Sequence, residues 1–175
     1  KMEESMDSNH DAPFNHHAVI QIQELIREAT MLNHQDLHEE IESYLVFMLM
    51  RFMKTPQLAD STLAIELLEQ HLHSVEQQKE NLQHIGDKCL IYQGFFPRFA
   101  IKKSVNPNYF TSIGKSAYHS LYQVLEKRHD TNSQLFQYLA DDFQSLSQIL
   151  FTIEQNKHQA REQMLLLDKI KKSRY

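Results

Sequence analysis

The sequence predicts an all-α protein, a bundle of about five helices in which the third and the last helix are long. The 175-residue chain contains three glycines and four prolines, the two residue types that interrupt helices. Apolar residues recur at intervals of three and four over most of its length, which is the spacing of one helix face. An apolar fraction of 41% and a charged fraction of 23% are ordinary for a globular domain. We therefore expect one helical domain over residues 15–175, preceded by a polar, flexible N-terminal arm over residues 1–14.

The apolar spacing places the first three helices over about residues 16–32, 36–54 and 60–96. Asp36 has the side chain of an N-cap for the second helix. Thr55-Pro56 ends that helix, because the residue before a proline disfavours helical backbone. The third helix begins near Asp60 in this interpretation and is the longest of the three.

A fourth helix opens at Asn106 and Pro107, with the asparagine as N-cap and the proline in the first turn. It ends before a polar break at residues 129–132. The last helix follows and would form a rod of about 50 Å over its ~35 residues. Its apolar residues are Leu135, Leu139, Phe143, Leu146, Leu150 and Ile153, and the same register continues through Lys157 and Ala160 to Met164 and Leu167.

This sustained register is typical of a coiled coil, which needs a partner helix of similar length. The third helix is the only internal candidate. Where it does not cover the rod, a second copy of the chain must, so we expect a homodimer. The alternative is a monomer in which the last helix bends back on itself.

The charges are unevenly divided along the chain. Residues 1–80 carry five basic and fifteen acidic side chains, and residues 81–175 carry thirteen basic and eight acidic ones. We interpret these mainly as the solvated faces of helices, although the opposed halves can also attract one another. The acidic total disfavours a dedicated nucleic-acid-binding protein.

Targeting and membrane signals are weak. The acidic start of the chain, residues 2–7, has no apolar signal-peptide core. The longest strongly apolar run, residues 44–50, is far shorter than the ~20 residues that span a bilayer. The lone Cys89 cannot form an internal disulfide. We expect a cytoplasmic protein without membrane contact.

All three glycines fall within 29 residues, at positions 86, 94 and 114. Gly86 lies beside Cys89, and Gly114 shares a helix face with Ala117. Two such patches of low side-chain bulk allow close approach of two helices. We expect them to face each other at a helix crossing, where each fills the volume that the other lacks.

The same stretch is rich in aromatic rings and cations. One interpretation is an aromatic mini-core under a loop, with the lysines in solvent. A second is a pocket with an apolar floor and a cationic rim for a small anionic or aromatic ligand, and a third is stacking of nucleic-acid bases on exposed rings. The candidate ligand-binding residues are Tyr92, Phe95, Phe96, Arg98, Phe99, Lys102, Lys103, Tyr109, Lys115 and Tyr118.

Four short segments, residues 86–90, 94–97, 109–110 and 114–118, read Gly-Asp-Lys-Cys-Leu, Gly-Phe-Phe-Pro, Tyr-Phe and Gly-Lys-Ser-Ala-Tyr. Together they resemble an uncharacterised family of helical proteobacterial proteins, and residues 44–54 look similar too. The resemblance implies that this segment is a defining feature of the domain. It implies no activity.

Chemical motifs are incomplete. Gly114-Lys115-Ser116 has the tail of a phosphate-binding loop without its first glycine or preceding strand. Glu126 and His129 form a single Glu-x-x-His spacing where a di-iron bundle needs two. The pair His34 and His38 is better explained as solvated side chains than as a zinc site.

We assign no catalytic residues, no metal ligands and no cofactor. The sequence favours a non-catalytic helical interaction, adaptor or regulatory protein that acts as a homodimer and has an unidentified protein partner. The alternative is a small-ligand-binding module centred on residues 86–122. An enzyme whose site residues are scattered along the sequence stays open.

Overall fold

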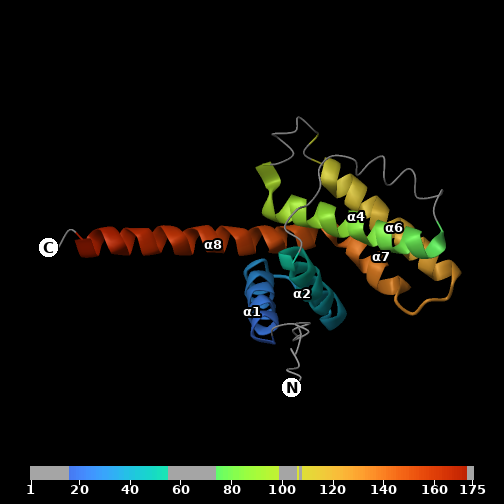
Figure 1. Ribbon diagram of the computed structural model, residues 1–175, viewed down its shortest axis with the longest axis horizontal. Coiled ribbons are helices and arrows are strands. Elements are labelled where there is room, and N and C mark those ends of the chain that lie inside the picture. Colours follow the sequence, from blue (N-terminus) through green and yellow to red (C-terminus); the bar gives the residue numbers. More distant parts are fainter. Residues whose placement is uncertain (1–15, 55–73, 99–105, 107, 173–175) are drawn as a thin grey trace, which may run out of the picture.

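The computed structural model of the chain describes residues 16–54, 74–98, 106 and 108–172. This part of the chain is all helical, with no strand, and the prediction of an all-α bundle is confirmed. Its helices are α1 (His16–Leu32), α2 (Glu39–Lys54), α4 (Val75–Phe95), α6 (Tyr109–Lys127), α7 (Ser133–Asp141) and α8 (Phe143–Lys172) (Figure 1).

A tight turn joins α1 to α2. His34 has a φ of 53°, the left-handed conformation that often closes a helix. The second helix begins at Glu39 and not at Asp36. The first hydrogen bonds of this helix are accepted by the backbone carbonyl of His38. Glu42 then links the two helices, since it accepts hydrogen bonds from Gln23 at 2.8 Å and Arg27 at 3.0 Å.

The expected third helix is not continuous from Asp60 to Phe96, because the backbone of Ser74 is extended. Ser74 is the N-cap of α4 and its hydroxyl accepts from the backbone N–H of Gln77 at 3.4 Å, so the helix begins at Val75. The expected segment 60–73 lies outside the described residues. The α6 helix likewise starts later than expected: its N-cap is Asn108, while the side chain of Asn106 accepts from the Asn108 backbone N–H at 2.8 Å.

The expected last helix is two helices. Asp142, with φ −94° and ψ 11°, separates α7 from α8. The break lets the two helices contact different neighbours, because α7 packs mainly on α6 whereas α8 packs on α4 and α1. The apolar register runs through the break without a change of spacing, so the sequence gives no sign of it.

The three glycines lie where helices cross, but Gly86 and Gly114 do not fill each other's missing volume. A Cβ atom on Gly86 would lie 2.4 Å from the ring of Tyr118. A Cβ atom on Gly114 would lie 2.4 Å from the ring of Phe143 and 2.8 Å from Cβ of Cys89. The contact between Gly114 and Cys89 joins the two expected patches, whereas aromatic rings lie nearest to both glycines.

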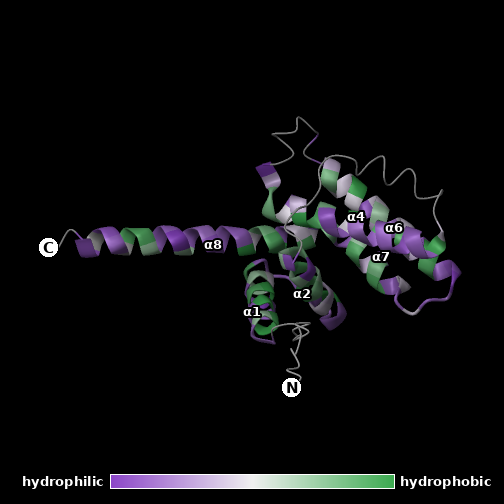
Figure 2. Ribbon diagram, in the orientation of Figure 1, coloured by the Kyte–Doolittle hydropathy of each residue, from purple (hydrophilic) through white to green (hydrophobic). Residues whose placement is uncertain are grey.

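The helices form a compact body from which α8 projects (Figure 1). Ile153, at 5% exposure, is the last buried side chain described on α8, and every described side chain from Lys157 to Lys172 is exposed. Figure 2 shows polar residues along most of this projecting half, interrupted by apolar ones. Neither α4 nor any other described helix covers it.

Candidate functional site

The carboxylate of Asp87 is a buried charged group that lies among three helices. One carboxylate oxygen, Oδ1, accepts hydrogen bonds from the hydroxyls of Tyr44 at 2.5 Å and Tyr118 at 2.7 Å. The other, Oδ2, accepts from the guanidinium of Arg51 at 3.0 Å. Asp87 belongs to α4, Tyr44 and Arg51 to α2 and Tyr118 to α6, so one carboxylate joins all three helices.

Local sequence explains the arrangement. Tyr44 and Arg51 are seven residues apart, which is two helical turns, and therefore share a face of α2. The Arg51 guanidinium also lies 5.7 Å from the centre of the Tyr44 ring. Gly86 leaves room for the ring of Tyr118, and the next residue, Asp87, receives its hydroxyl.

Burial dominates the electrostatics of this cluster. It raises the pKa of Asp87 above its usual value of 3.8, although the hydrogen bonds of Tyr44, Tyr118 and Arg51 act in the opposite direction. Burial, together with the nearby carboxylate, also raises the pKa of both tyrosines well above 10.0. The two phenols therefore remain protonated donors at neutral pH.

This arrangement is suited to holding helices together. Both carboxylate oxygens already accept hydrogen bonds from protein donors, and the tyrosines are weaker acids than free tyrosine. A general base or nucleophile needs a pKa near the working pH and access to a substrate, and the Asp87 side chain is only 12% exposed. We interpret the cluster as a buried polar network that fixes the positions of α2, α4 and α6.

The sequence analysis missed Asp87, Tyr44 and Arg51. One signal was present: a charged pair, Asp87-Lys88, interrupts an otherwise apolar run that contains a glycine. A charge in such a run needs a partner if it is buried. Sequence alone does not show that the partner comes from a helix more than thirty residues away.

Several residues of the proposed ligand site lie in the core. Tyr118 is fully buried and donates to Asp87, so it is not available to a ligand from solvent. Tyr92 and Tyr109 pack on Phe110, with ring centres 5.1 Å and 5.2 Å apart. This part of the segment matches the aromatic mini-core interpretation.

Phe95 and Phe96 lie at the edge of the body and line an open groove between α1, α2, α4 and α8. Arg98 lies in an adjoining hollow with Glu154 and His158 of α8. Lys115 is exposed on α6, away from the groove residues. Three candidates, Phe99, Lys102 and Lys103, lie outside the described residues.

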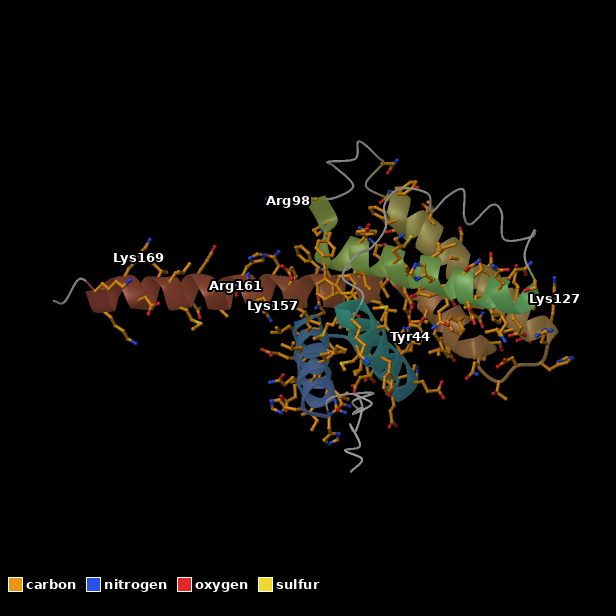
Figure 3. All side chains as sticks on the ribbon, viewed as in Figure 1. Tyr44, Arg98, Lys127, Lys157, Arg161 and Lys169 are labelled. Atoms are coloured by element: carbon orange, nitrogen blue, oxygen red, sulfur yellow. The ribbon has the colours of Figure 1, made fainter. Side chains whose placement is uncertain are left out.

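The projecting half of α8 is the second exposed feature. Met164, Leu165 and Leu166 are 68%, 61% and 57% exposed. Arg161 precedes them and Asp168 follows them, and neither has a hydrogen-bond or ion-pair partner within the part of the chain described. Figure 3 shows the side chains of Lys157, Arg161 and Lys169 extending from the rod.

The described residues offer neither a metal site nor a bilayer-spanning helix. No group of three His, Cys, Asp or Glu side chains there is placed to hold a metal ion. Among the same residues no helix is both long and apolar enough to span a bilayer. Cys89 is fully buried against the α6 backbone at Gly114.

Comparison of the chain with protein-family models, with curated proteins and with solved structures finds no significant match. Any functional conclusion therefore depends on the geometry described above.

Proposed function

We propose that the protein is a helical interaction module that forms a homodimer through the projecting half of α8. The observation that carries this proposal is the exposure of Met164, Leu165 and Leu166 on a helix that has already left the body. Large apolar side chains gathered on a protruding element are typical of an interaction site. The apolar spacing of residues 160, 164 and 167 continues the buried register of the same helix, so a second helix can pack along it.

The charges of this segment favour a second copy in the antiparallel direction. In an antiparallel pair centred on Met164, residue 160 of one copy meets residue 168 of the other, and residue 161 meets residue 167. Arg161 then lies one position from Asp168 of the other copy, within reach of its long side chain, and this pairing occurs twice because the pair has two-fold symmetry. Lys157 and Lys171 meet at the two ends, where long side chains reach solvent.

The test begins with the mass of the protein in solution, measured by sedimentation over a range of concentrations. We expect the wild type to be a dimer and Met164→Glu to be a monomer with an unchanged melting temperature. Met31→Glu is the matched control, because Met31 is 75% exposed on α1 and does not belong to the projecting half of α8. A monomeric wild type, or a dimer that Met31→Glu disrupts and Met164→Glu does not, would overturn the proposal.

A charge exchange tests the direction of pairing. Arg161→Glu sets two acidic side chains against each other at both ends of the antiparallel pair, and we expect the dimer to weaken by about tenfold. The double variant Arg161→Glu/Asp168→Arg restores opposite charges and should restore the wild-type affinity. Failure of the second change to restore affinity would contradict the antiparallel register.

A further inference from the structure

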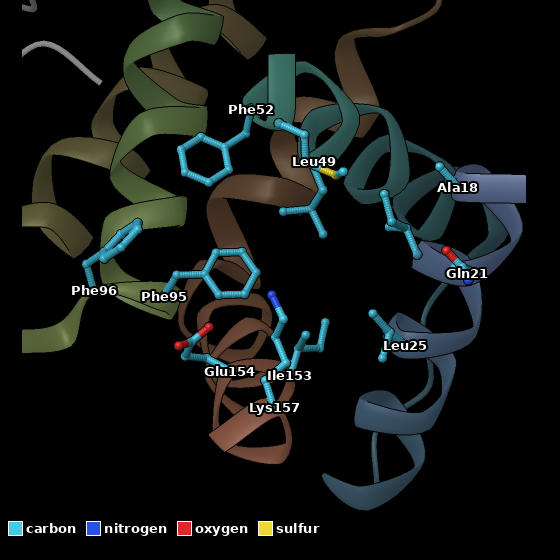
Figure 4. A pocket seen from close by; sticks show the side chains of 12 residues that line it. Ala18, Gln21, Leu25, Leu49, Phe52, Phe95, Phe96, Ile153, Glu154 and Lys157 are labelled. Atoms are coloured by element: carbon cyan, nitrogen blue, oxygen red, sulfur yellow. The ribbon is translucent and has the colours of Figure 1, made fainter. Parts of the chain in front are cut away.

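We infer that the groove at the root of α8 holds Tyr175 of a second copy, so that each body of the dimer receives the end of the other copy's chain. The inference rests on the dimer proposed above. The groove lies where α1, α2, α4 and α8 meet and has a volume of about 370 Å³. Figure 4 shows the rings of Phe52, Phe95 and Phe96 on one side of it and Leu25 on the other.

The walls of the groove carry apolar surface that the body leaves uncovered. Leu25 is 39% exposed, Met53 62% and Phe96 44%, and they come from α1, α2 and the end of α4. Large exposed apolar side chains that converge in this way are typical of an interaction site. Glu154 and Lys157 also line the groove, and their charges offset each other. The apolar walls therefore determine the kind of occupant, and they favour an aromatic side chain whose polar end stays in solvent.

The groove continues the face of α8 on which the proposed dimer forms. Ile153 and Lys157 line the groove, and Met164 follows Ile153 by eleven residues, which is three helical turns. The three side chains therefore lie on one side of the helix. A second helix that packs on Met164 leads along α8 to the groove.

The register of the dimer brings Tyr175 to this place. Ile153 and Tyr175 are both eleven residues from Met164, one before it and one after it. An antiparallel pair centred on Met164 thus sets Tyr175 of one copy level with Ile153 of the other. Tyr175 itself lies outside the described residues, three positions after Lys172, the last residue of α8.

The Tyr175 of the same chain cannot reach the groove. Lys172 lies about 22 Å beyond Lys157 along the helix axis, at the rise of an α-helix. Three further residues span at most about 11 Å, even when fully extended. Within the proposed dimer, the ring must therefore come from the second copy.

The size of the helix pair also favours a further contact. From Lys157 to Lys171 the pair comprises about two heptads, whereas a coiled coil is typically sustained over three or four. A ring in the groove adds apolar contact beyond the end of the pair. Because the dimer has two-fold symmetry, this contact forms twice.

Sedimentation of the full-length protein over a range of concentrations tests the inference. Tyr175→Ala should weaken the dimer by about tenfold, because it removes an aromatic side chain from the interface. Tyr175→Phe keeps the ring and should retain most of the affinity. Met53→Glu places a charge in the groove wall and should also weaken the dimer by about tenfold. Met31→Glu is its matched control, because Met31 is exposed and does not line the groove.

A double variant tests direct contact between the two sites. Tyr175→Ala/Met53→Glu should dimerise about as well as Met53→Glu alone, because either change removes the same contact. Additive losses, or wild-type affinity in either single variant, would overturn the inference. The proposed dimer would survive that result if Met164→Glu were still a monomer, whereas a monomeric wild type would overturn both.

Discussion

Gly94 of α4 faces Leu150 of α8 with no space for a side chain between them. A Cβ atom on Gly94 would lie 2.4 Å from Cβ of Leu150 and 3.2 Å from the backbone carbonyl oxygen of Ser147. These atoms are fixed by the backbone of α8, so neither can move aside without moving the helix. The contact holds the root of α8 against the body, close to the point where the helix leaves it.

We therefore expect Gly94→Ala to destabilise the protein by about 1–2 kcal/mol. Overpacking of a helix contact costs about 1–3 kcal/mol, and the better helix propensity of alanine offsets up to about 1 kcal/mol. Urea denaturation measures the change. Gln93→Ala, at the adjacent position, is the control and should differ little from the wild type. A stability of Gly94→Ala equal to or above that of the wild type would contradict this packing.

Asp87→Ala should destabilise the protein more than Gly94→Ala does. It leaves the hydroxyls of Tyr44 and Tyr118 buried without their acceptor, and loss of one member of a buried charged network costs about 3–5 kcal/mol. Asp141→Ala, on the exposed surface of α7, should have a small effect.

A triple variant separates the loss of the network from the loss of volume. Asp87→Leu combined with Tyr44→Phe and Tyr118→Phe removes the buried acceptor together with its two hydroxyl donors, and should be more stable than Asp87→Ala. Equal stability of the two variants would show that the hydrogen bonds matter less than the packing.

The raised pKa of Asp87 predicts a dependence of stability on acidity. Because the folded protein binds this proton more tightly than the unfolded chain does, the contribution of the carboxyl group is greatest below its unfolded pKa of 3.8. It is lost as the pH rises through the higher folded pKa. The free energy of unfolding of the wild type, measured relative to Asp87→Asn, should therefore increase as the pH falls from 7 toward 4. A constant or decreasing difference would contradict the direction of the shift.

The two buried tyrosines predict a loss of stability in alkali. Their pKa values lie well above 10.0 in the folded protein, so the unfolded chain releases these protons first. Stability should fall as the pH rises above 10, and ultraviolet titration should show Tyr44 and Tyr118 ionising only on unfolding. The double variant Tyr44→Phe/Tyr118→Phe should lose this delayed absorbance change. If the variant and the wild type gave the same ultraviolet titration, the buried phenols would not be the source of the delayed absorbance change.

Much of the fold follows from the local pattern of the sequence. The bounds of α1, Leu32 included, agree with the expected range because one apolar face and a polar turn define them. The break at Asp142 does not follow from the sequence pattern, because the apolar register continues through it. What distinguishes α7 from α8 is their contacts with different helices.

The candidate site was predicted less well, because contacts between separate helices bring its residues together. Phe95 and Phe96 were expected because they stand out within one segment, and they line the groove. Lys157 also lines the groove, but it belongs to a helix that starts nearly fifty residues later, and its place there depends on the position at which α8 crosses α1 and α4. The Asp87 cluster similarly joins residues from three helices, and sequence spacing cannot reveal such a meeting.

The length of α8 has a consequence for the dimer that we propose. With the antiparallel register centred on Met164, the two Lys157 residues lie fourteen positions apart along the paired helices, or about 20 Å at the rise of an α-helix. The two bodies, each with its groove, would then be held at a fixed separation on a short two-helix spacer. A partner with two matching attachment points could engage both at once and bind more tightly than through either alone. The number of residues in α8 would thus determine which bivalent partners can be bridged.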